Sequence, residues 1–246
     1  MSDTIADATT ARSAGKAEVL LPFVRTTSDG AQAAPFAATA AVIAGWAARD
    51  TDAIETHIRE LEEIGVARPR ATPMFYRVAA SLLTCDDAIQ VAGGDSSGEA
   101  EPVYVMFEDG LWIGLGSDHT DRKLETVGVT LSKQVCAKPV GPELWRYEDV
   151  ADHWDTLILR SRIEVGGSER LYQEGTLADL RTPRDLLQRF EAAGGAAASG
   201  MVMFGGTLPV IGGLTPSDAM HLELEDPILG RRLTHSYRID ALAIAD

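Results

Sequence analysis

The chain has 246 residues, a formal net charge of −15 and 45% hydrophobic residues. This composition is typical of a globular protein with one large domain or two small ones and enough apolar residues for a buried core. An acidic surface repels phosphate groups, so we expect no binding to nucleic acid or to anionic membranes.

The N-terminus is rich in Ala, Ser, Thr and Asp and lacks the basic and apolar regions of a secretory signal. We therefore expect a mobile tail over residues 1–16 and a single domain over residues 17–246. No apolar run approaches the roughly 20 residues that cross a bilayer. Cys85 and Cys136 form no metal-binding pair and fit a reducing cytosol, as small buried hydrophobes. The sequence thus predicts a cytoplasmic protein.

The first elements are predicted by two apolar runs and one periodic stretch. Residues 19–24 and 40–45 read as strands, the first at a sheet edge because Pro22 cannot donate a ladder hydrogen bond. Residues 50–64 read as a helix that begins on aspartate N-caps and stops at Gly65. The apolar face of this helix is formed by Ile54, Ile58 and Leu61.

Two hairpins are predicted further along the chain. Residues 101–107 and 111–115 are β-branched and aromatic, and they flank a Glu-Asp-Gly turn. Residues 162–165 and 170–173 flank Gly166-Gly167 in the same way.

Helical signals lie between and after these hairpins. Residues 147–159 predict a polar helix, although residues 155–160 also fit the start of a strand. Thr182-Pro183 predicts the start of another helix that runs through Phe190. Further strands are expected at residues 201–204, 220–224 and 233–239. Many short strands with few helices predict an α+β fold with a β-rich core.

Three carboxylates form the first candidate site. Glu99 and Glu101 are two residues apart, so they share one face of a strand. Like charges this close require a cation, a shared proton or open solvent. Asp118 would complete an oxygen-only ligand set for Mg²⁺, Mn²⁺ or Ca²⁺. Taken alone, the Glu-x-Glu pattern is more often a solvated strand face.

Three further segments carry groups that catalysis uses. His57 and Glu60 share a helix face, where a carboxylate can orient an imidazole or exchange protons with it. Lys133, in a neutral stretch, could stabilise an oxyanion. The amides and hydroxyl around Gly206 and Thr207 could cradle a carboxylate. The alternatives are a solvated helical pair, an exposed lysine and a plain tight loop.

Several common enzyme motifs are missing from the sequence. It contains no G-x-S-x-G elbow, no HExxH and no dinucleotide fingerprint after a strand. A serine nucleophile, a zinc peptidase and a dehydrogenase therefore have no motif to support them.

The order of the candidate segments is more specific than any one of them. The series His-x-x-Glu, Glu-x-Glu, Asp-x-Thr-x-Arg, Lys and Gly-Thr stands at residues 57–60, 99–101, 118–122, 133 and 206–207. This series resembles the fumarylacetoacetate hydrolase superfamily over roughly residues 40 to 240. The chain looks closest to a bacterial branch outside the well-studied hydrolases.

The resemblance implies a fold, a cofactor and a reaction class. It implies a mixed β-sandwich roll with a short lid helix, a homodimer, and Glu99, Glu101 and Asp118 as metal ligands. The implied enzyme cleaves a C–C bond in a small 2-oxo acid or 1,3-dicarbonyl, such as an acylpyruvate of aromatic catabolism. Mg²⁺ or Mn²⁺ would polarise the carbonyl, and Ca²⁺ also fits the ligands. Decarboxylation, hydration, tautomerisation and a non-catalytic binding protein remain alternatives, since fold does not fix function.

The resemblance also assigns roles to individual residues. Glu60, oriented by His57, is expected to deprotonate the attacking water, and Lys133 to add positive charge at the enolate. The expected substrate-binding residues are Arg77, Arg122, Gly206 and Thr207.

The chain departs from the family pattern at two places. A Lys-Pro that often follows a phenylalanine is absent, and Arg77 is expected to take over anion binding because its planar fork suits a carboxylate. The stretch from Glu101 to Asp118 is short, which trims the pocket walls without disturbing the ligand set.

Overall fold

The computed structural model describes residues 17–28, 30–63 and 68–245. In the first helix the side chains of five residues are also not described, namely Ala53, His57, Glu60, Leu61 and Glu63. The predictions of a tail over residues 1–16 and of a helix stop at Gly65 lie outside the described residues.

An eight-stranded sheet has the order β2-β1-β12-β9-β8-β15-β3-β4. Its strands are β1 (Val19–Thr27), β2 (Gly30–Ala38), β3 (Ala40–Gly45), β4 (Met74–Val78), β8 (Ala100–Phe107), β9 (Gly110–Ser117), β12 (Glu143–Arg146) and β15 (Met201–Phe204). The hairpin predicted around the Glu-Asp-Gly turn is confirmed as β8 and β9, which pair from Ala100↔Ser117 to Phe107↔Gly110.

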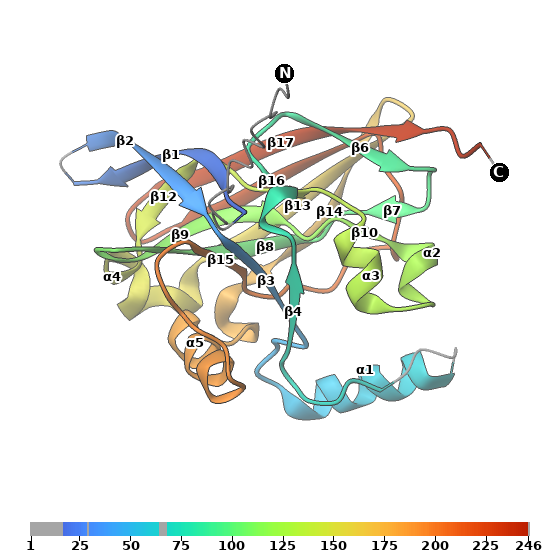
Figure 1. The fold of residues 1–246 in the computed structure, drawn as a ribbon, viewed down its shortest axis with the longest axis horizontal. Helices are drawn as coiled ribbons and strands as arrows, with labels where there is room; N and C mark the ends of the chain where they lie inside the picture. The colour runs from blue at the N-terminus through green and yellow to red at the C-terminus, as the bar shows by residue number, and fades with distance from the viewer. Residues whose placement is uncertain (1–16, 29, 64–67, 246) are drawn as a thin grey trace, which may run out of the picture.

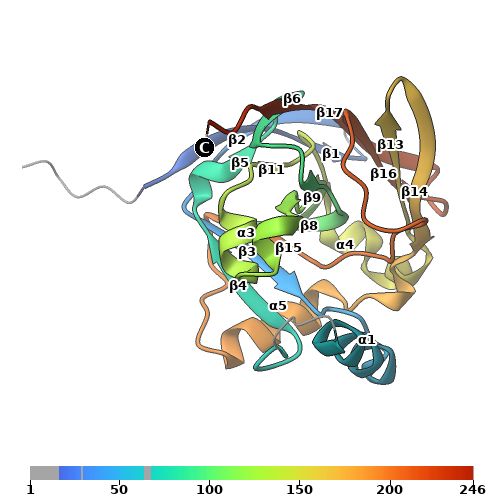
Figure 2. The same ribbon diagram turned by 90° about the vertical axis from the view of Figure 1, so that its right-hand side faces the viewer.

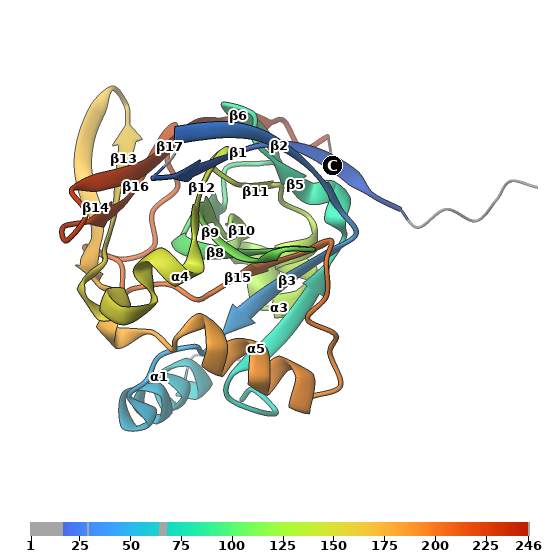
Figure 3. The same ribbon diagram turned by 90° about the vertical axis from the view of Figure 1, so that its left-hand side faces the viewer.

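A five-stranded sheet has the order β14-β13-β16-β17-β6. Its strands are β6 (Ala88–Ala92), β13 (Ile158–Val165), β14 (Ser168–Thr176), β16 (Ala219–Asp226) and β17 (Arg231–Leu242). Two short pairs join β7 (Ser96–Ser97) to β10 (Thr120–Asp121) and β5 (Leu83–Thr84) to β11 (Lys138–Pro139). The strands curl around the β8–β9 hairpin (Figures 2 and 3), so the predicted β-rich α+β fold is confirmed.

The core packs against both faces of β8. Successive strand side chains point to opposite faces, so Val103 and Val105 enter one apolar cluster with Phe204, while Tyr104 enters the other with Tyr172. All of these side chains are buried. Each apolar side chain removed from water this way contributes about 1.5–3 kcal/mol. The hairpin that carries the candidate carboxylates is therefore held from two sides.

The two long helices begin where their capping residues predict. In α1 (Thr51–Glu63) the Asp50 carboxylate accepts the Asp52 N–H at 2.9 Å, and Ile54 and Ile58 are buried. In α5 (Pro183–Ala192) the Thr182 hydroxyl accepts an N–H of the first turn at 3.3 Å. The shorter helices are α2 (Arg122–Glu125), α3 (Val129–Gln134), α4 (Tyr147–Val150), η1 (Ala80–Leu82), η2 (Ala151–Thr156) and η3 (Leu177–Asp179). Within the described residues, no helix is both long and apolar enough to cross a membrane.

Two predictions about these elements are wrong. The strand with Pro22 is not at the edge, because β1 lies between β2 and β12. Its pairing with β12 starts only at Val24, so the missing N–H of Pro22 faces no strand on that side. The polar helix over residues 147–159 is broken into α4 and η2, with a non-helical backbone at His153 (φ −129°), and the chain enters β13 at Ile158.

Candidate functional site

Three carboxylates converge at the open end of the β8–β9 hairpin. Glu101 lies in β8, Glu99 directly precedes that strand, and Asp118 directly follows β9. The Asp118 N–H donates to the Glu99 carbonyl at 3.0 Å, which continues the ladder past the strand ends. One carboxylate oxygen from each residue lies within 4.8 Å of the others. The elements β7, β10, α2 and α3 gather at this end of the molecule (Figure 1).

Glu101 is the ligand candidate with the most unusual environment. It is 3% exposed, and one of its oxygens accepts the Gly206 N–H at 2.7 Å. Burial, and then the charges of Asp118 and Glu99, raise the pKa of Glu101 well above its ordinary value. The Lys133 ammonium and the Gly206 N–H oppose this rise. A cation among the carboxylates would relieve the same repulsion.

Asp118 is held between two lysines. Lys133 donates a hydrogen bond to its Oδ2, and the Lys138 ammonium lies 3.1 Å from its Oδ1. Burial by itself would raise the pKa of Asp118, but the two ammonium groups outweigh it and keep the pKa below its ordinary value. Oδ1 accepts no aligned hydrogen bond even though Lys138 is close, so this buried oxygen has a lone pair to offer.

Arg122 pairs with the third carboxylate. Its guanidinium lies 3.4 Å from Glu99 and 3.0 Å from Glu125, and its Nε donates to the Ser97 hydroxyl at 2.7 Å. Arg122 is therefore at the predicted site, where its contacts orient Glu99. Counting Lys133 and Lys138, three cations face the three carboxylates.

The Gly-Thr loop reaches the site through its backbone. Gly206 has a φ of +92°, a conformation that favours glycine, and it aims its N–H at Glu101. The Thr207 hydroxyl donates to the Ala100 carbonyl at 2.8 Å. The loop therefore supports the carboxylate strand directly.

Arg77 is not brought to the carboxylates. It is exposed on β4, and its guanidinium lies over the Phe190 ring at 5.5 Å. The preceding residue, Tyr76, points to the other face, where the Lys133 ammonium lies 5.7 Å from its ring. Because side chains alternate along a strand, Tyr76 and not Arg77 faces the site. The expectation that Arg77 binds an anion there has no contact to support it.

His57 and Glu60 lie in α1, as predicted. Their side chains are outside the described part of the structure, so their predicted roles stay predictions.

Two residues at the site had no clear signal in the sequence. Lys138 is fully buried, and it also donates to the His119 carbonyl. Gln173, on β14, is fully buried and donates to Thr207 at 2.7 Å. A lysine before a proline and a glutamine in a strand are ordinary patterns, and only their long-range partners distinguish them.

A buried polar network surrounds His119, the residue that follows Asp118. One ring nitrogen of His119 lies 3.0 Å from the Tyr237 hydroxyl, and the other lies 2.9 Å from the Ser96 hydroxyl. Burial, with smaller effects of Lys138 and Arg122, lowers the pKa of His119 to about 3, so the ring is neutral at pH 7. A neutral imidazole with both nitrogens engaged is typical of a structural support.

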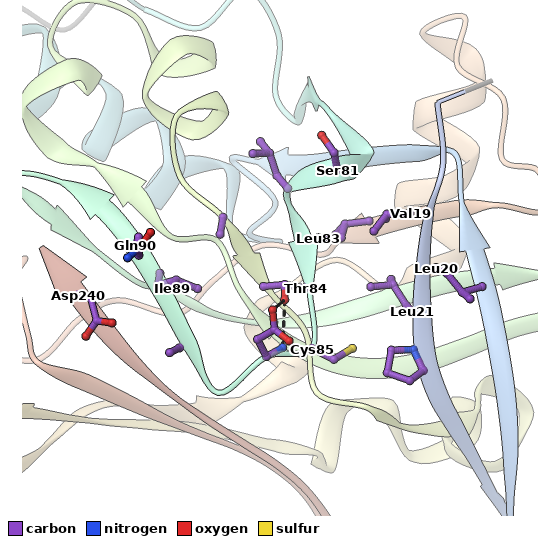
Figure 4. A pocket seen from close by; sticks show the side chains of 15 residues that line it. Val19, Leu20, Leu21, Ser81, Leu83, Thr84, Cys85, Ile89, Gln90 and Asp240 are labelled. Atoms are coloured by element: carbon purple, nitrogen blue, oxygen red, sulfur yellow. Dashed lines mark hydrogen bonds between the residues drawn. The ribbon is translucent and has the colours of Figure 1, made fainter. Parts of the chain in front are cut away.

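A cleft of about 790 Å³ lies apart from the carboxylates. It is lined by the start of β1, by η1 and β5, by the loop into β6, and by Ala137 and Asp240 (Figure 4). Thr84 donates to Asp86 at 2.7 Å within it. None of the candidate site residues lines this cleft.

The cluster formed by the three carboxylates suits a hard divalent cation. Its donors are oxygens only, they converge, and one buried oxygen accepts no hydrogen bond. Glu99, Glu101 and Asp118 would hold the cation, while Lys133 and Lys138 offset the negative charge of Asp118.

The family model described as "Protein of unknown function (DUF2848)" matches residues 44–237. The chain belongs to DUF2848. Comparison with curated proteins gives no match. Solved structures with the same fold are those of the fumarylacetoacetate hydrolase superfamily, so the resemblance read from the motif order is confirmed for the fold of this DUF2848 member.

Three of these structures illustrate the likeness. A proposed fumarylacetoacetate isomerase/hydrolase from Oleispira antarctica is 18% identical with a TM-score of 0.64, covering 88% of this chain and 98% of that one. A proposed fumarylpyruvate hydrolase from Burkholderia cenocepacia is 19% identical with a TM-score of 0.62, covering 98% and 100%. A 2-keto-3-deoxyarabinonate dehydratase is 16% identical with a TM-score of 0.62, covering 90% and 80%. At these identities the likeness concerns the fold.

Proposed function

We propose that this chain is a metal-dependent hydrolase that cleaves a C–C bond in a small 2-oxo acid or 1,3-dicarbonyl, such as an acylpyruvate. The observation that carries the proposal is the convergence of Glu99, Glu101 and Asp118 beside the buried Lys133. A divalent cation held by these carboxylates, Mg²⁺ or Mn²⁺ in the first instance and Ca²⁺ as a further candidate, would supply the Lewis acid that polarises a substrate carbonyl.

Lys133 would stabilise negative charge on the substrate. Burial opposes its charged form, but Asp118 and Glu99 outweigh burial and raise the pKa of Lys133 above its ordinary value. Lys133 is therefore a fixed positive charge at neutral pH. A fixed charge in a water-poor site stabilises a developing oxyanion more strongly than a mobile charge in water.

Glu60 and His57, which lie in α1, would activate the attacking water. Their three-residue spacing places them on one face of that helix, where His57 can orient the Glu60 carboxylate as a general base. Closure of this helix over the substrate would keep bulk water out. On the same family resemblance we propose that the enzyme is a cytoplasmic homodimer.

A second reaction class shares these requirements. The dehydratase with the same fold supports loss of water from a small oxo acid as an alternative, and decarboxylation or tautomerisation would use the same stabilised negative charge. The products separate these reactions, because C–C hydrolysis alone gives two carbonyl-containing fragments.

The test is turnover of acylpyruvates and β-oxo acids with Mg²⁺ or Mn²⁺ and with EDTA. Wild type is compared with Glu99→Ala and with Glu169→Ala, which removes an exposed carboxylate on β14. We expect metal-dependent cleavage that falls at least about 100-fold in Glu99→Ala and is unchanged in Glu169→Ala. Equal inertness of all three proteins with no bound metal would leave a non-catalytic binding protein.

A further inference from the structure

Strand β8, which carries Glu101 and directly follows Glu99, loses its neighbour β15 at the end where these carboxylates lie. β15 pairs with β8 from Val105 to Val103, and Gly205 then donates to the Pro102 carbonyl at 2.9 Å. The β15–β8 ladder ends at Phe204↔Val103, and at Gly206 the backbone leaves the strand conformation, with a φ of +92°. One edge of Ala100, the residue between the two glutamates, therefore faces no strand.

Ala100 cannot leave its backbone groups unpaired on that edge. Alternate residues of a strand direct their N–H and C=O groups to the same side, so Ala100 and Pro102 share the open edge. Proline has no N–H, which leaves the Ala100 N–H as the backbone donor of this stretch. Ala100 is fully buried, and an unmade hydrogen bond there would cost about 1–3 kcal/mol.

Two side chains take the place of the absent strand. The Gln173 carbonyl oxygen accepts the Ala100 N–H at 2.9 Å, and the Thr207 hydroxyl donates to the Ala100 C=O at 2.8 Å. The Gln173 amide nitrogen donates to Thr207 at 2.7 Å and to the Leu208 carbonyl at 2.8 Å. The same Gln173 oxygen also accepts the Ser161 hydroxyl at 2.8 Å. These bonds close a ring through Ala100, Gln173 and Thr207.

We propose that Gln173 is a positioning residue that fixes the backbone of Ala100 and, through it, the carboxylates of Glu99 and Glu101. Its importance for catalysis rests on the proposed function, because both glutamates are proposed ligands there. Ligand groups must hold their geometry within about 0.5 Å, and a peptide unit that shifts between two ligands moves both. Gln173 also ties the Gly206 loop to the strand, since it bonds Thr207 and Leu208 on that loop.

The test compares Gln173→Met with Ser161→Ala. Methionine has a similar length and cannot make these hydrogen bonds, whereas Ser161→Ala removes one partner of Gln173 and keeps its bonds to Ala100 and Thr207. In the metal-free protein we expect the Ala100 amide to exchange with deuterium at least about 10-fold faster in Gln173→Met, relative to the amides of β9, since its acceptor is lost. We expect Mg²⁺ affinity, measured by calorimetry, to fall about 10–100-fold, the usual effect of losing an outer-shell partner. Ser161→Ala should change neither quantity.

Each result supports or overturns the proposal. Unchanged exchange at Ala100 overturns it, and so does faster exchange with unchanged Mg²⁺ affinity, because Gln173 would then only stabilise the fold. If the wild-type protein binds no divalent cation, the proposed function fails. Faster exchange of the Ala100 amide in Gln173→Met would still support the proposal that Gln173 fixes the backbone of Ala100. Should Gln173→Met not fold, Thr207→Val removes the donor to the Ala100 C=O and one acceptor of Gln173, so it is expected to lower Mg²⁺ affinity in the same direction. An unchanged Mg²⁺ affinity in Thr207→Val would then overturn the proposal.

Discussion

The carboxylate site and the cleft of Figure 4 share the β5–β11 strand pair as a border. Lys138 of β11 directs its ammonium to Asp118, while the neighbouring Ala137 lines the cleft. At the site three carboxylates and three cations converge. The cleft is lined mainly by apolar side chains, and its Thr84 and Asp86 bond to each other. In this fold, convergent charge, more than open volume, marks the place where chemistry is expected.

The largest expected effect is on metal binding and turnover, and it should be seen for a substitution at the carboxylate site and not for one at the cleft. Glu101→Gln keeps the acceptor for Gly206 but removes a charge among the ligands, so Mg²⁺ affinity should fall at least about 100-fold in calorimetry and turnover with it. Ser81→Trp, which places a large ring at the cleft, should leave both unchanged. If Ser81→Trp abolished turnover and Glu101→Gln did not, the substrate site would have to be assigned to the cleft.

The next effect concerns the stability of their shared border. Lys138→Met removes the fully buried ammonium and leaves the Asp118 oxygen and the His119 carbonyl without it. Asp118 keeps its ion pair with Lys133, so the cost is that of leaving buried acceptors unsatisfied, and we expect a loss of about 1–3 kcal/mol in urea unfolding. The control is Lys123→Met, an exposed lysine on α2, which should change stability by less than about 0.5 kcal/mol. Equal stability of the two variants would show that Lys138 contributes nothing to holding Asp118.

The smallest effect tests the thiol of the cleft. Burial, and to a lesser degree Asp86, raises the pKa of Cys85 to about 12. Only the thiolate reacts, and its fraction at pH 8 is then about 10⁻⁴. In a Cys136→Ala background, iodoacetamide should label Cys85 at least about 100-fold more slowly than free cysteine at pH 8. The rate should rise about tenfold per pH unit toward pH 12. If Cys85 were labelled as fast as free cysteine, the prediction would be wrong and Cys85 would be a reactive nucleophile in the cleft.

Local sequence patterns predicted α1, α5 and nine of the 17 strands in the described residues, but not β2, β4 or β12 of the larger sheet. The Glu-Asp-Gly turn predicted the β8–β9 hairpin, and Gly166-Gly167 predicted the β13–β14 hairpin. Thr182-Pro183 predicted the start of α5. These signals succeed because turns and caps depend on a few adjacent residues. The edge assignment of Pro22 failed because strand order is set by partners far away in the chain.

For the candidate site, spacing predicted that two of the carboxylates lie together, and the resemblance to the superfamily named all three as ligands. Glu99 and Glu101 share a strand face by their two-residue spacing, and the hairpin between them and Asp118 brings its two ends side by side. The order of the motifs, through the resemblance to the superfamily, also predicted the fold. Arg77 was placed at the site by analogy with a missing lysine, and strand alternation directs it toward Phe190 instead.

By itself, then, the sequence determined the β-rich fold and the set of three carboxylates, because both follow from periodicity, turns and the order of motifs. Tertiary structure alone decided what surrounds them. Lys138 meets Asp118 only because β11 pairs with β5. Gln173 meets Ala100, a residue 73 positions earlier in the chain, only because the five-stranded sheet packs against the eight-stranded sheet. The physical reason is that a buried charge or amide is defined by its partners, and those partners are chosen by packing across the whole fold.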